Sequence, residues 1–315
     1  MPLPILIDTD MGVDDAIAVT LALLSEKLSV KALVSVGGNV PLLQATQNIG
    51  RLLRALQLDP RPIVGVGLDQ HKQGLSDARH VFGRDGLGET PWPVLEPFEP
   101  LAFTKVYRTA IEQHPGELVI IAIGPLTNLA EIHRTNPALL KQAARIVVMG
   151  GAIWCKGNVE GLAEFNFYRD PAAADLILGA GLPVTLVPLD LTNFLQMDES
   201  HLARLHACDH PAAKFLASIL NWPLTLGAPE PAAGYAPGRF LVHDGAAVGA
   251  LLWPELFRGV QLAVRICTEG AACGKCQPVP RRDASRKPVS VLTAVDAVDF
   301  LENMLEALCT QRFVV

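Results

Sequence analysis

Four aspartates lie within eight positions in the stretch "DTDMGVDD", directly behind an apolar run: Asp8, Asp10, Asp14 and Asp15. Carboxylates this close repel one another, and burial at the end of a strand strengthens the repulsion. A helix that begins near Asp14 offsets part of this charge, because its dipole stabilises carboxylates in the first turn. Four carboxylates exceed what a helix cap needs. A divalent cation converts the repulsion into coordination, and ligands that are all oxygen atoms select a hard ion such as Ca²⁺ or Mg²⁺.

Polar residues also follow most of the later apolar runs. The carboxyl ends of parallel strands meet at one edge of a sheet, where ligands bind in open parallel sheets. Carboxylates, carboxamides and glycines at these positions therefore predict a binding site at that edge. The residues are Asn39 in "GGN", Asn128 in "GPLTN", Asn158, Glu164 and Asn166 in "GGAIWCKGNVEGLAEFN", Asp190 in "DLT", and His243 and Asp244 in "VHDGAA".

The elements that position these residues are short apolar runs separated by longer helical patterns. Strands that are apolar without alternation are buried on both faces, as a parallel sheet with helical crossovers requires. The sequence therefore predicts an α/β fold: an open, mostly parallel, doubly wound (Rossmann-like) sheet with helices on both faces. Predicted strands cover residues 4–8, 30–36, 62–67, 117–123, 145–150, 183–189 and 289–295, and predicted helices cover 14–26, 42–57, 126–135, 170–181 and 298–311.

The composition is typical of a globular protein that binds small molecules. The 315 residues are 50% hydrophobic and 18% charged, and the formal net charge is -6 with a pI near 5.8. The scattered basic residues leave no positive surface for nucleic acid or an anionic membrane. The first stretch, "MPLPILIDTD", has neither the basic region of a signal peptide nor the length of a membrane span. We therefore expect a soluble, cytoplasmic protein whose partners are small molecules or other copies of the chain.

Domain organisation is predicted to be simple, with a single domain over 1–315. The stretch 222–240 is rich in Pro, Gly and Ala and predicts a mobile loop or lid. The six cysteines are unevenly spaced and predict no disulfide framework. Cys273 and Cys276 form a "CGKC" pair without a second pair at zinc spacing, so two loop thiols are expected there.

Six stretches of the chain match a known series of motifs in the same order. They are "DTDMGVDDAIAV", "SVGGN", "IGPLTNLAEI", "VVMGGAIWCKGNVEGLAEFNFYRDPAAA", "VPLDLT" and "VHDGAAVGALL", and the similarity around them extends from Ile5 to about Phe300. This series resembles the inosine-uridine-preferring nucleoside hydrolase family. The resemblance implies an open α/β fold with one Ca²⁺ at the floor of a cleft. It also implies an N-glycosyl hydrolase that cleaves ribonucleosides to ribose and free base, in nucleoside metabolism and nucleotide salvage.

The resemblance assigns both the calcium ligands and the catalytic groups. Asp10, Asp15 and Asp244 would supply carboxylates, and Ile123 would supply its backbone carbonyl. The ribose 2′ and 3′ hydroxyls and a water would complete a shell of the size that Ca²⁺ prefers. Asp10 would also be the general base for the metal-bound water. His243 would face the nucleobase and protonate the leaving ring nitrogen.

By the same resemblance, a second set of side chains binds the ribose. An analogue that lacks a hydroxyl leaves a buried partner unpaired, so a preference for ribonucleosides over deoxyribonucleosides is expected. Asp8 is left without chemistry and is expected to be a structural hydrogen-bond acceptor. The implied hydroxyl clamps are Asp14, Asn39, Asn158, Glu164 and Asn166, with Met149 lining the ribose floor.

The chain departs from the family pattern on the base side of the site. Met11 stands where the family usually has proline, and Phe82 stands where a base-side histidine is common, with His80 two positions away. The usual "TRGxT" near the C-terminus is replaced by "ACGKCQP". These departures leave the base preference (pyrimidine, purine or broad) open. Three aromatic residues are candidates for closing over the base: Trp222, Tyr235 and Phe240.

Two alternative functions remain open from the residues alone. "LIDTDMG" also resembles the nucleophile loop of haloacid-dehalogenase-like phosphatases, in which Asp8 would attack phosphate, Asp10 would be the acid/base and Mg²⁺ the metal. The other is a ribonucleoside-binding protein on the nucleoside hydrolase scaffold that has lost catalysis. The family resemblance further implies a homodimer or homotetramer.

Overall fold

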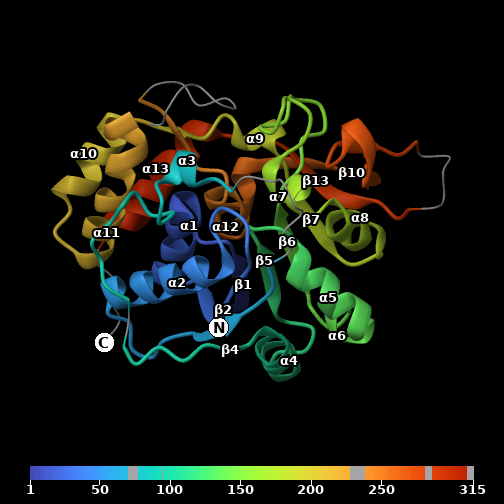
Figure 1. Cartoon of the computed structure of the whole chain (residues 1–315), viewed down its shortest axis with the longest axis horizontal. Coiled ribbons are helices and arrows are strands. Elements are labelled where there is room, and N and C mark those ends of the chain that lie inside the picture. Colours follow the sequence, from blue (N-terminus) through green and yellow to red (C-terminus); the bar gives the residue numbers. More distant parts are fainter. Residues whose placement is uncertain (70–76, 95, 228–237, 281–285, 311–315) are drawn as a thin grey trace.

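The computed structural model describes residues 1–69, 77–94, 96–227, 238–280 and 286–310. Its centre is a nine-stranded sheet with the order β10-β13-β7-β6-β5-β1-β2-β3-β4 (Figure 1). Every neighbouring pair is parallel except β10 with β13, so the predicted mostly parallel α/β sheet is confirmed. The strands are β1 Leu3–Thr9, β2 Leu28–Ser35, β3 Ile63–Val66, β4 Leu101–Ala102, β5 Val119–Ala122, β6 Arg145–Met149, β7 Val184–Val187, β10 Phe257–Leu262 and β13 Val289–Val295.

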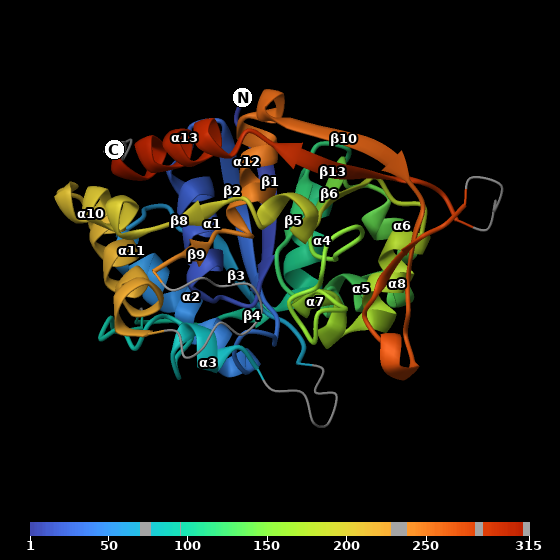
Figure 2. The same ribbon diagram turned by 90° about the horizontal axis from the view of Figure 1, so that it is seen from above.

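Helices cover both faces of this sheet (Figure 2). Strand β1 explains why two layers are needed: Ile5 and Ile7 are buried in one hydrophobic cluster, whereas Leu6 is buried in the other. Side chains alternate across a strand, so a strand that is apolar at every position needs a hydrophobic layer on each side. The principal helices are α1 Val13–Leu24, α2 Leu42–Leu56, α11 Pro211–Asn221, α12 Gly245–Leu252 and α13 Ala297–Cys309 around the first cluster, and α4 Phe103–Gln113, α5 Thr127–Thr135, α6 Pro137–Leu140 and α8 Pro171–Gly179 around the second.

Shorter elements complete the described chain. The π-helix Trp222–Gly227 continues directly from α11. Two small antiparallel pairs lie outside the main sheet, β8 (Gln196–Met197) with β9 (Phe240–Leu241), and β11 (Val264–Ile266) with β12 (Cys276–Pro278). The remaining short helices are α3 Arg79–Phe82, α7 Phe165–Arg169, α9 Leu189–Thr192, α10 Glu199–Ala207, and the 3-10 turns Pro254–Leu256 and Gly270–Ala272.

The strand register brings the predicted site residues to one edge of the sheet. Asp8 in β1 lies beside Val34 in β2 and Ala122 in β5, and Ala122 lies beside Val148 in β6. Strand β5 ends at Ala122, and the other three strands end one residue later, so the segments that follow them leave the sheet side by side. The predicted convergence of the post-strand polar residues is therefore confirmed as a property of the fold.

The structure differs from the predicted elements mainly at the edges of the sheet. Strands β4 and β10 were not predicted, because β4 has two residues and the middle of β10 is exposed. Phe240, a predicted lid residue, instead lies fully buried in β9. Tyr235, the second candidate, lies outside the described residues. The single domain over 1–315 remains a prediction, and no helix in the described part of the chain is long and apolar enough to cross a membrane.

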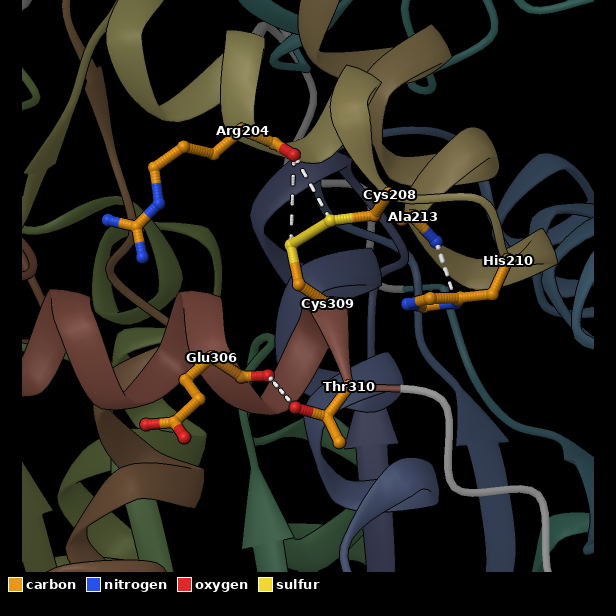
Figure 3. Close-up of a disulfide and its surroundings, with 7 residues drawn as sticks. All are labelled: Arg204, Cys208, His210, Ala213, Glu306, Cys309 and Thr310. Carbon is orange, nitrogen blue, oxygen red and sulfur yellow. Dashed lines mark hydrogen bonds between the residues drawn. A yellow bond between two sulfur atoms is a disulfide. The ribbon is translucent and has the colours of Figure 1, made fainter.

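One disulfide joins Cys208, which follows α10, to Cys309, the last residue of α13 (Figure 3). The two cysteines are 101 residues apart in sequence, with Cα atoms 5.6 Å apart. Cysteine spacing could not reveal this pair, because the fold alone brings the two helix ends together. Next to it, His210 caps α11 by accepting a hydrogen bond from the backbone N–H of Ala213 at 3.4 Å.

Candidate active site

Three carboxylates meet where β1 ends and where α1 and α12 begin. Asp14 and Asp15 lie in the first turn of α1, and Asp244 is the N-cap residue of α12. One oxygen from each lies within 4.8 Å of the others, and all three residues are buried. The N-terminal ends of two helices face this group, and their dipoles stabilise negative charge there.

Asp10 lies beside this group, and Asn39 holds both of its oxygens. The backbone N–H of Asn39 donates to Oδ2 of Asp10 at 2.7 Å, and its Nδ2 donates to Oδ1 at 3.1 Å. Nδ2 also donates to Oδ2 of Asp15 at 3.0 Å. A Cβ atom on Gly38 would lie 2.0 Å from Oδ2 of Asp10, so the "GGN" turn requires glycine here. The structure thus brings Asp10, Asp15 and Asn39 together as predicted, but the tightest group of carboxylates contains Asp14 rather than Asp10.

Burial raises the pKa of every carboxyl in this cluster, and repulsion by neighbouring carboxylates raises the pKa values of Asp10, Asp14 and Asp244 further. The pKa of Asp14 rises from 3.8 to about 8, first through desolvation and then through the charge of Asp15. The pKa values of Asp10 and Asp244 lie well above the ordinary value for the same two causes. Oδ1 of Asp14 is also a buried oxygen without a hydrogen-bond partner among the described residues. Oxygen donors, mutual repulsion and an unpaired acceptor together fit a hard divalent cation such as Ca²⁺.

The backbone carbonyl of Ile123 lies at the adjoining end of β5. The backbone N–H of Ile123 donates to the carbonyl of Asp8 at 2.9 Å, and the carbonyl of Ile123 accepts from Nδ2 of Asn166 at 3.0 Å. The same Nδ2 lies 3.4 Å from the carbonyl and 3.7 Å from Sδ of Met149, at the end of β6. The structure therefore brings together three residues predicted from two separate motifs.

Glu164 and Asn158 shape the segment between β6 and α7. Glu164 is the N-cap of α7, and its carboxylate accepts from the backbone N–H groups of Gly151, Asn166 and Phe167 at 2.9, 2.8 and 3.1 Å. Burial raises the pKa of Glu164 to about 6, and these hydrogen bonds limit the rise. Oδ1 of Asn158 accepts from the N–H of Phe165 at 2.9 Å. Both predicted clamps therefore also fix the backbone at the start of α7.

The loop after β6 is held from the opposite side by Asp190 in α9. Its two oxygens accept from the backbone N–H groups of Ile153, Trp154 and Cys155 at 2.8, 2.7 and 3.0 Å. The polar residue predicted after the sixth strand therefore acts on the backbone of this loop.

His243 lies next to Asp244 and is buried, which lowers the pKa of its imidazole to about 4. The ring is therefore neutral near pH 7 and carries one hydrogen. Its Nδ1 lies 2.7 Å from Oγ1 of Thr192, the last residue of α9. Thr192 was not among the predicted site residues, although "VPLDLT" ends on it, because the sequence around a threonine does not reveal which side chain it will contact.

Asp8 is confirmed as a hydrogen-bond acceptor. Its Oδ2 accepts from the hydroxyl of Tyr107 at 2.6 Å and from Nδ2 of Asn128 at 2.9 Å. Oδ1 of Asn128 accepts in turn from the N–H of Leu68 at 2.8 Å, so this buried network ties β1 to α4 and α5. These contacts give Asp8 a structural role rather than the nucleophilic role that the phosphatase alternative assigns to it.

Comparison with known proteins places this arrangement in a family. The model of the inosine-uridine preferring nucleoside hydrolase family matches residues 5–302. The chain belongs to that family. Nucleoside hydrolases act on an N-glycosidic bond, so the chain is an N-glycosyl hydrolase, as the resemblance implied.

Relatives of this nucleoside hydrolase are similar along most of their length. The pyrimidine-specific ribonucleoside hydrolase RihA of Shewanella woodyi is 34% identical over 98% of this chain and 99% of its own. RihA of Citrobacter koseri is 36% identical over 86% of each chain. Among solved structures, the plant nucleoside hydrolase PpNRh1 superposes with a TM-score of 0.90 at 30% identity, covering 99% of this chain and 100% of its own.

Met11 changes the backbone of the nucleoside hydrolase motif. It adopts a φ of 48°, which the ring of the usual proline forbids. Its N–H donates to Oγ1 of Thr9 at 3.1 Å, a bond that proline cannot make, and its carbonyl accepts from Nδ2 of Asn48 at 3.1 Å. The substitution therefore alters the turn between Asp10 and Gly12 rather than only removing a rigid φ.

Phe82 offers no polar group at the position where the family commonly has a base-side histidine. It is 4% exposed and packs edge to face on Phe240, with ring centroids 6.3 Å apart. His80 is exposed, and its Nδ1 lies 3.2 Å from the carbonyl of Asp77. Cys273 and Cys276 remain thiols, but Cys276 is buried at the start of β12 rather than lying in a loop. The described carboxylate cluster contains neither.

Proposed function

We propose that this nucleoside hydrolase uses Ca²⁺ to cleave ribonucleosides into ribose and free nucleobase. The observation that carries the proposal is the buried group of Asp14, Asp15 and Asp244 at the edge of the sheet. Asp10 lies beside this group, and His243 directly precedes Asp244. Asp10, Asp15, Asp244 and the carbonyl of Ile123 would hold the ion. Calcium fits this set better than zinc because every donor is an oxygen atom.

Asp10 is the general base of the proposed reaction. Bound calcium would lower the pKa of a coordinated water. Asp10 accepts the proton of the attacking water, and the two hydrogen bonds from Asn39 keep the carboxylate in a fixed orientation. The water oxygen bonds to C1′ of ribose as the bond from C1′ to the base breaks, through an oxocarbenium-like transition state.

His243 assists departure of the base. The electron pair of the broken bond goes to the ring nitrogen of the base, which needs a hydrogen-bond donor or a proton. Because the imidazole of His243 is neutral, only one of its nitrogens carries hydrogen. A hydroxyl of Thr192 that donates to Nδ1 leaves this hydrogen on Nε2, where it serves the leaving base.

Recognition of ribose follows from polar groups that are already fixed. Glu164, Asn158 and Asn166 are oriented by contacts with backbone groups at the start of α7. Asp14 has one oxygen without a partner among the described residues, which suits a ribose hydroxyl, and Nδ2 of Asn39 donates to the neighbouring Asp10 and Asp15. We propose that these five residues bind the ribose hydroxyls over a floor that includes Met149.

The base preference has to be measured, because similar proteins are named for different preferences. RihA of Shewanella woodyi is named pyrimidine-specific, whereas the structure from Gardnerella vaginalis, 26% identical with a TM-score of 0.88 over 97% of this chain and 98% of its own, is named purine-preferring. The family resemblance also leads us to propose a cytoplasmic homodimer or homotetramer. Light scattering of the purified protein measures that assembly.

Hydrolysis of uridine, cytidine, inosine and adenosine, with and without chelator, tests the proposal. We expect turnover of at least one substrate that chelator removes and Ca²⁺ restores. Asp10→Asn should abolish turnover while circular dichroism stays unchanged. A wild-type protein that binds ribonucleosides without cleaving them would instead favour a binding protein on this scaffold.

A further inference from the structure

Thr9, the last residue of β1, carries a buried hydroxyl next to the carboxylate cluster. Its Oγ1 lies 2.5 Å from Oδ1 of Asp15. The backbone of Thr9 is fixed by the sheet, because its carbonyl accepts from the N–H of Val36 at 3.0 Å. A β-branched side chain has few χ1 rotamers, so the hydroxyl has little freedom to move away from Asp15.

Met11 favours one direction for this hydrogen bond. Its backbone N–H donates to Oγ1 of Thr9 at 3.1 Å, so Oγ1 is already an acceptor and its own hydrogen serves a second partner. Two acceptors lie within reach of that hydrogen, Oδ1 of Asp15 at 2.5 Å and Sδ of Met11 at 3.7 Å. A carboxylate oxygen is a far stronger acceptor than a thioether sulfur, so the hydroxyl donates to Asp15. The proline that is usual at position 11 has no N–H and could not orient Thr9 in this way.

The second oxygen of Asp15 is held by other donors. Oδ2 accepts from the backbone N–H of Gly12 at 2.8 Å and from Nδ2 of Asn39 at 3.0 Å. Because Thr9 donates to Oδ1, both oxygens are hydrogen-bonded and the plane of the carboxylate is fixed. Each carboxylate oxygen has two lone pairs, so the hydroxyl of Thr9 leaves one lone pair of Oδ1 for a cation.

We propose that the hydroxyl of Thr9 positions Asp15 for calcium. The inference rests on the proposed function, in which Asp15 is a calcium ligand, and it adds a positioning residue that acts through Asp15. Hydrogen bonds from surrounding residues orient the ligands of a metal ion, and loss of such a partner typically weakens metal binding about 10- to 100-fold. Without the hydroxyl, the ion would have to order the carboxylate of Asp15 as it binds.

Isothermal titration of Ca²⁺ into protein stripped by chelator tests this inference. Thr9→Val keeps the shape of the side chain without its hydroxyl, and we expect it to bind calcium about 10- to 100-fold more weakly than the wild type. Thr9→Ser keeps the hydroxyl and should stay close to the wild-type affinity. Thr46→Val is the matched control and should bind calcium as the wild type does. Thr46 is also buried, but its hydroxyl contacts Oγ of Ser35 and the carbonyl of Leu42 rather than a carboxylate.

Denaturant unfolding separates a positioning residue from a structural one. Thr9→Val and Thr46→Val each lose a buried hydrogen bond, so both should unfold more easily than the wild type in EGTA. Excess Ca²⁺ should stabilise Thr46→Val as much as the wild type but Thr9→Val less, because the gain follows the affinity for the ion. Equal calcium affinity of Thr9→Val and the wild type, whatever their stability, would make Thr9 a structural residue and overturn the proposal.

The remaining outcomes are also decisive. If Thr9→Val does not fold, Thr9→Ser and Thr9→Ala differ by the same hydroxyl, and equal calcium affinity of these two variants overturns the proposal. A wild-type protein that binds no Ca²⁺ would refute both the proposed calcium site and the role of Thr9. A wild-type protein that binds Ca²⁺ but cleaves no nucleoside would refute the proposed hydrolysis alone, and the loss of affinity in Thr9→Val would still support the role of Thr9.

Discussion

Chelation should destabilise this protein, and the loss should grow with pH. The oxygens of Asp14, Asp15 and Asp244 lie within 4.8 Å of one another. At this separation each ionised pair repels by about 3.5 kcal/mol at an effective dielectric constant of about 20. Without a cation, protonation relieves this repulsion: burial first, and then the charge of Asp15, raise the pKa of Asp14 to about 8.

The sign of the pH dependence follows from that pKa. Between an unfolded value of 3.8 and a folded value of about 8, Asp14 binds more protons in the folded state than in the unfolded state. The free energy of unfolding therefore falls as pH rises through this window, by about 1.4 kcal/mol per unit and about 6 kcal/mol in all. A bound divalent cation favours the ionised carboxylates and removes this loss.

Denaturant unfolding with EGTA or with excess Ca²⁺, at about pH 5 and about pH 8, measures the effect. We expect calcium to stabilise the protein by several kcal/mol more at the higher pH. Asp14→Asn, which has nearly the same shape but cannot ionise, should remove much of the pH dependence of the chelated protein. A calcium effect of equal size at both pH values would refute this reasoning, and so would a chelated variant with the wild-type pH dependence.

Four further predictions concern other parts of the molecule. Thr192→Val should lower kcat about tenfold through the lost hydrogen bond to His243, with KM little changed, and Thr192→Ser should restore it; equal kcat values would contradict the role. Replacing a ribonucleoside by its 2′-deoxy analogue should lower kcat/KM roughly 5- to 150-fold, and comparable turnover would count against the ribose clamps. Tyr107→Phe should lower the free energy of unfolding by about 1–3 kcal/mol, since it takes a donor from a buried carboxylate, and denaturant titration checks this. Reduction of the Cys208–Cys309 disulfide should destabilise the protein by roughly 4–5 kcal/mol for a loop of about 100 residues, and the reductant should have no effect on Cys208→Ser.

The main sheet could be predicted because each of its central strands is apolar on both faces. Ile5, Leu6 and Ile7 occur consecutively, and only burial between two helical layers explains such a run. The edge strands could not be predicted in this way. Strand β10, Phe257–Leu262, pairs only with β13, so its exposed residues carry no hydrophobic pattern.

The same contrast separates the predicted site residues from those that the sequence did not reveal. Asp14 and Asp15 could be identified because the carboxylates in one short stretch repel one another, and the sequence alone reveals this repulsion. Thr192 acquires its role only when α9 meets His243, which is 51 residues away in sequence. The disulfide at Cys208 likewise depends on contact between the ends of two distant helices. Local chemistry was therefore predictable, and pairings made by the fold were not.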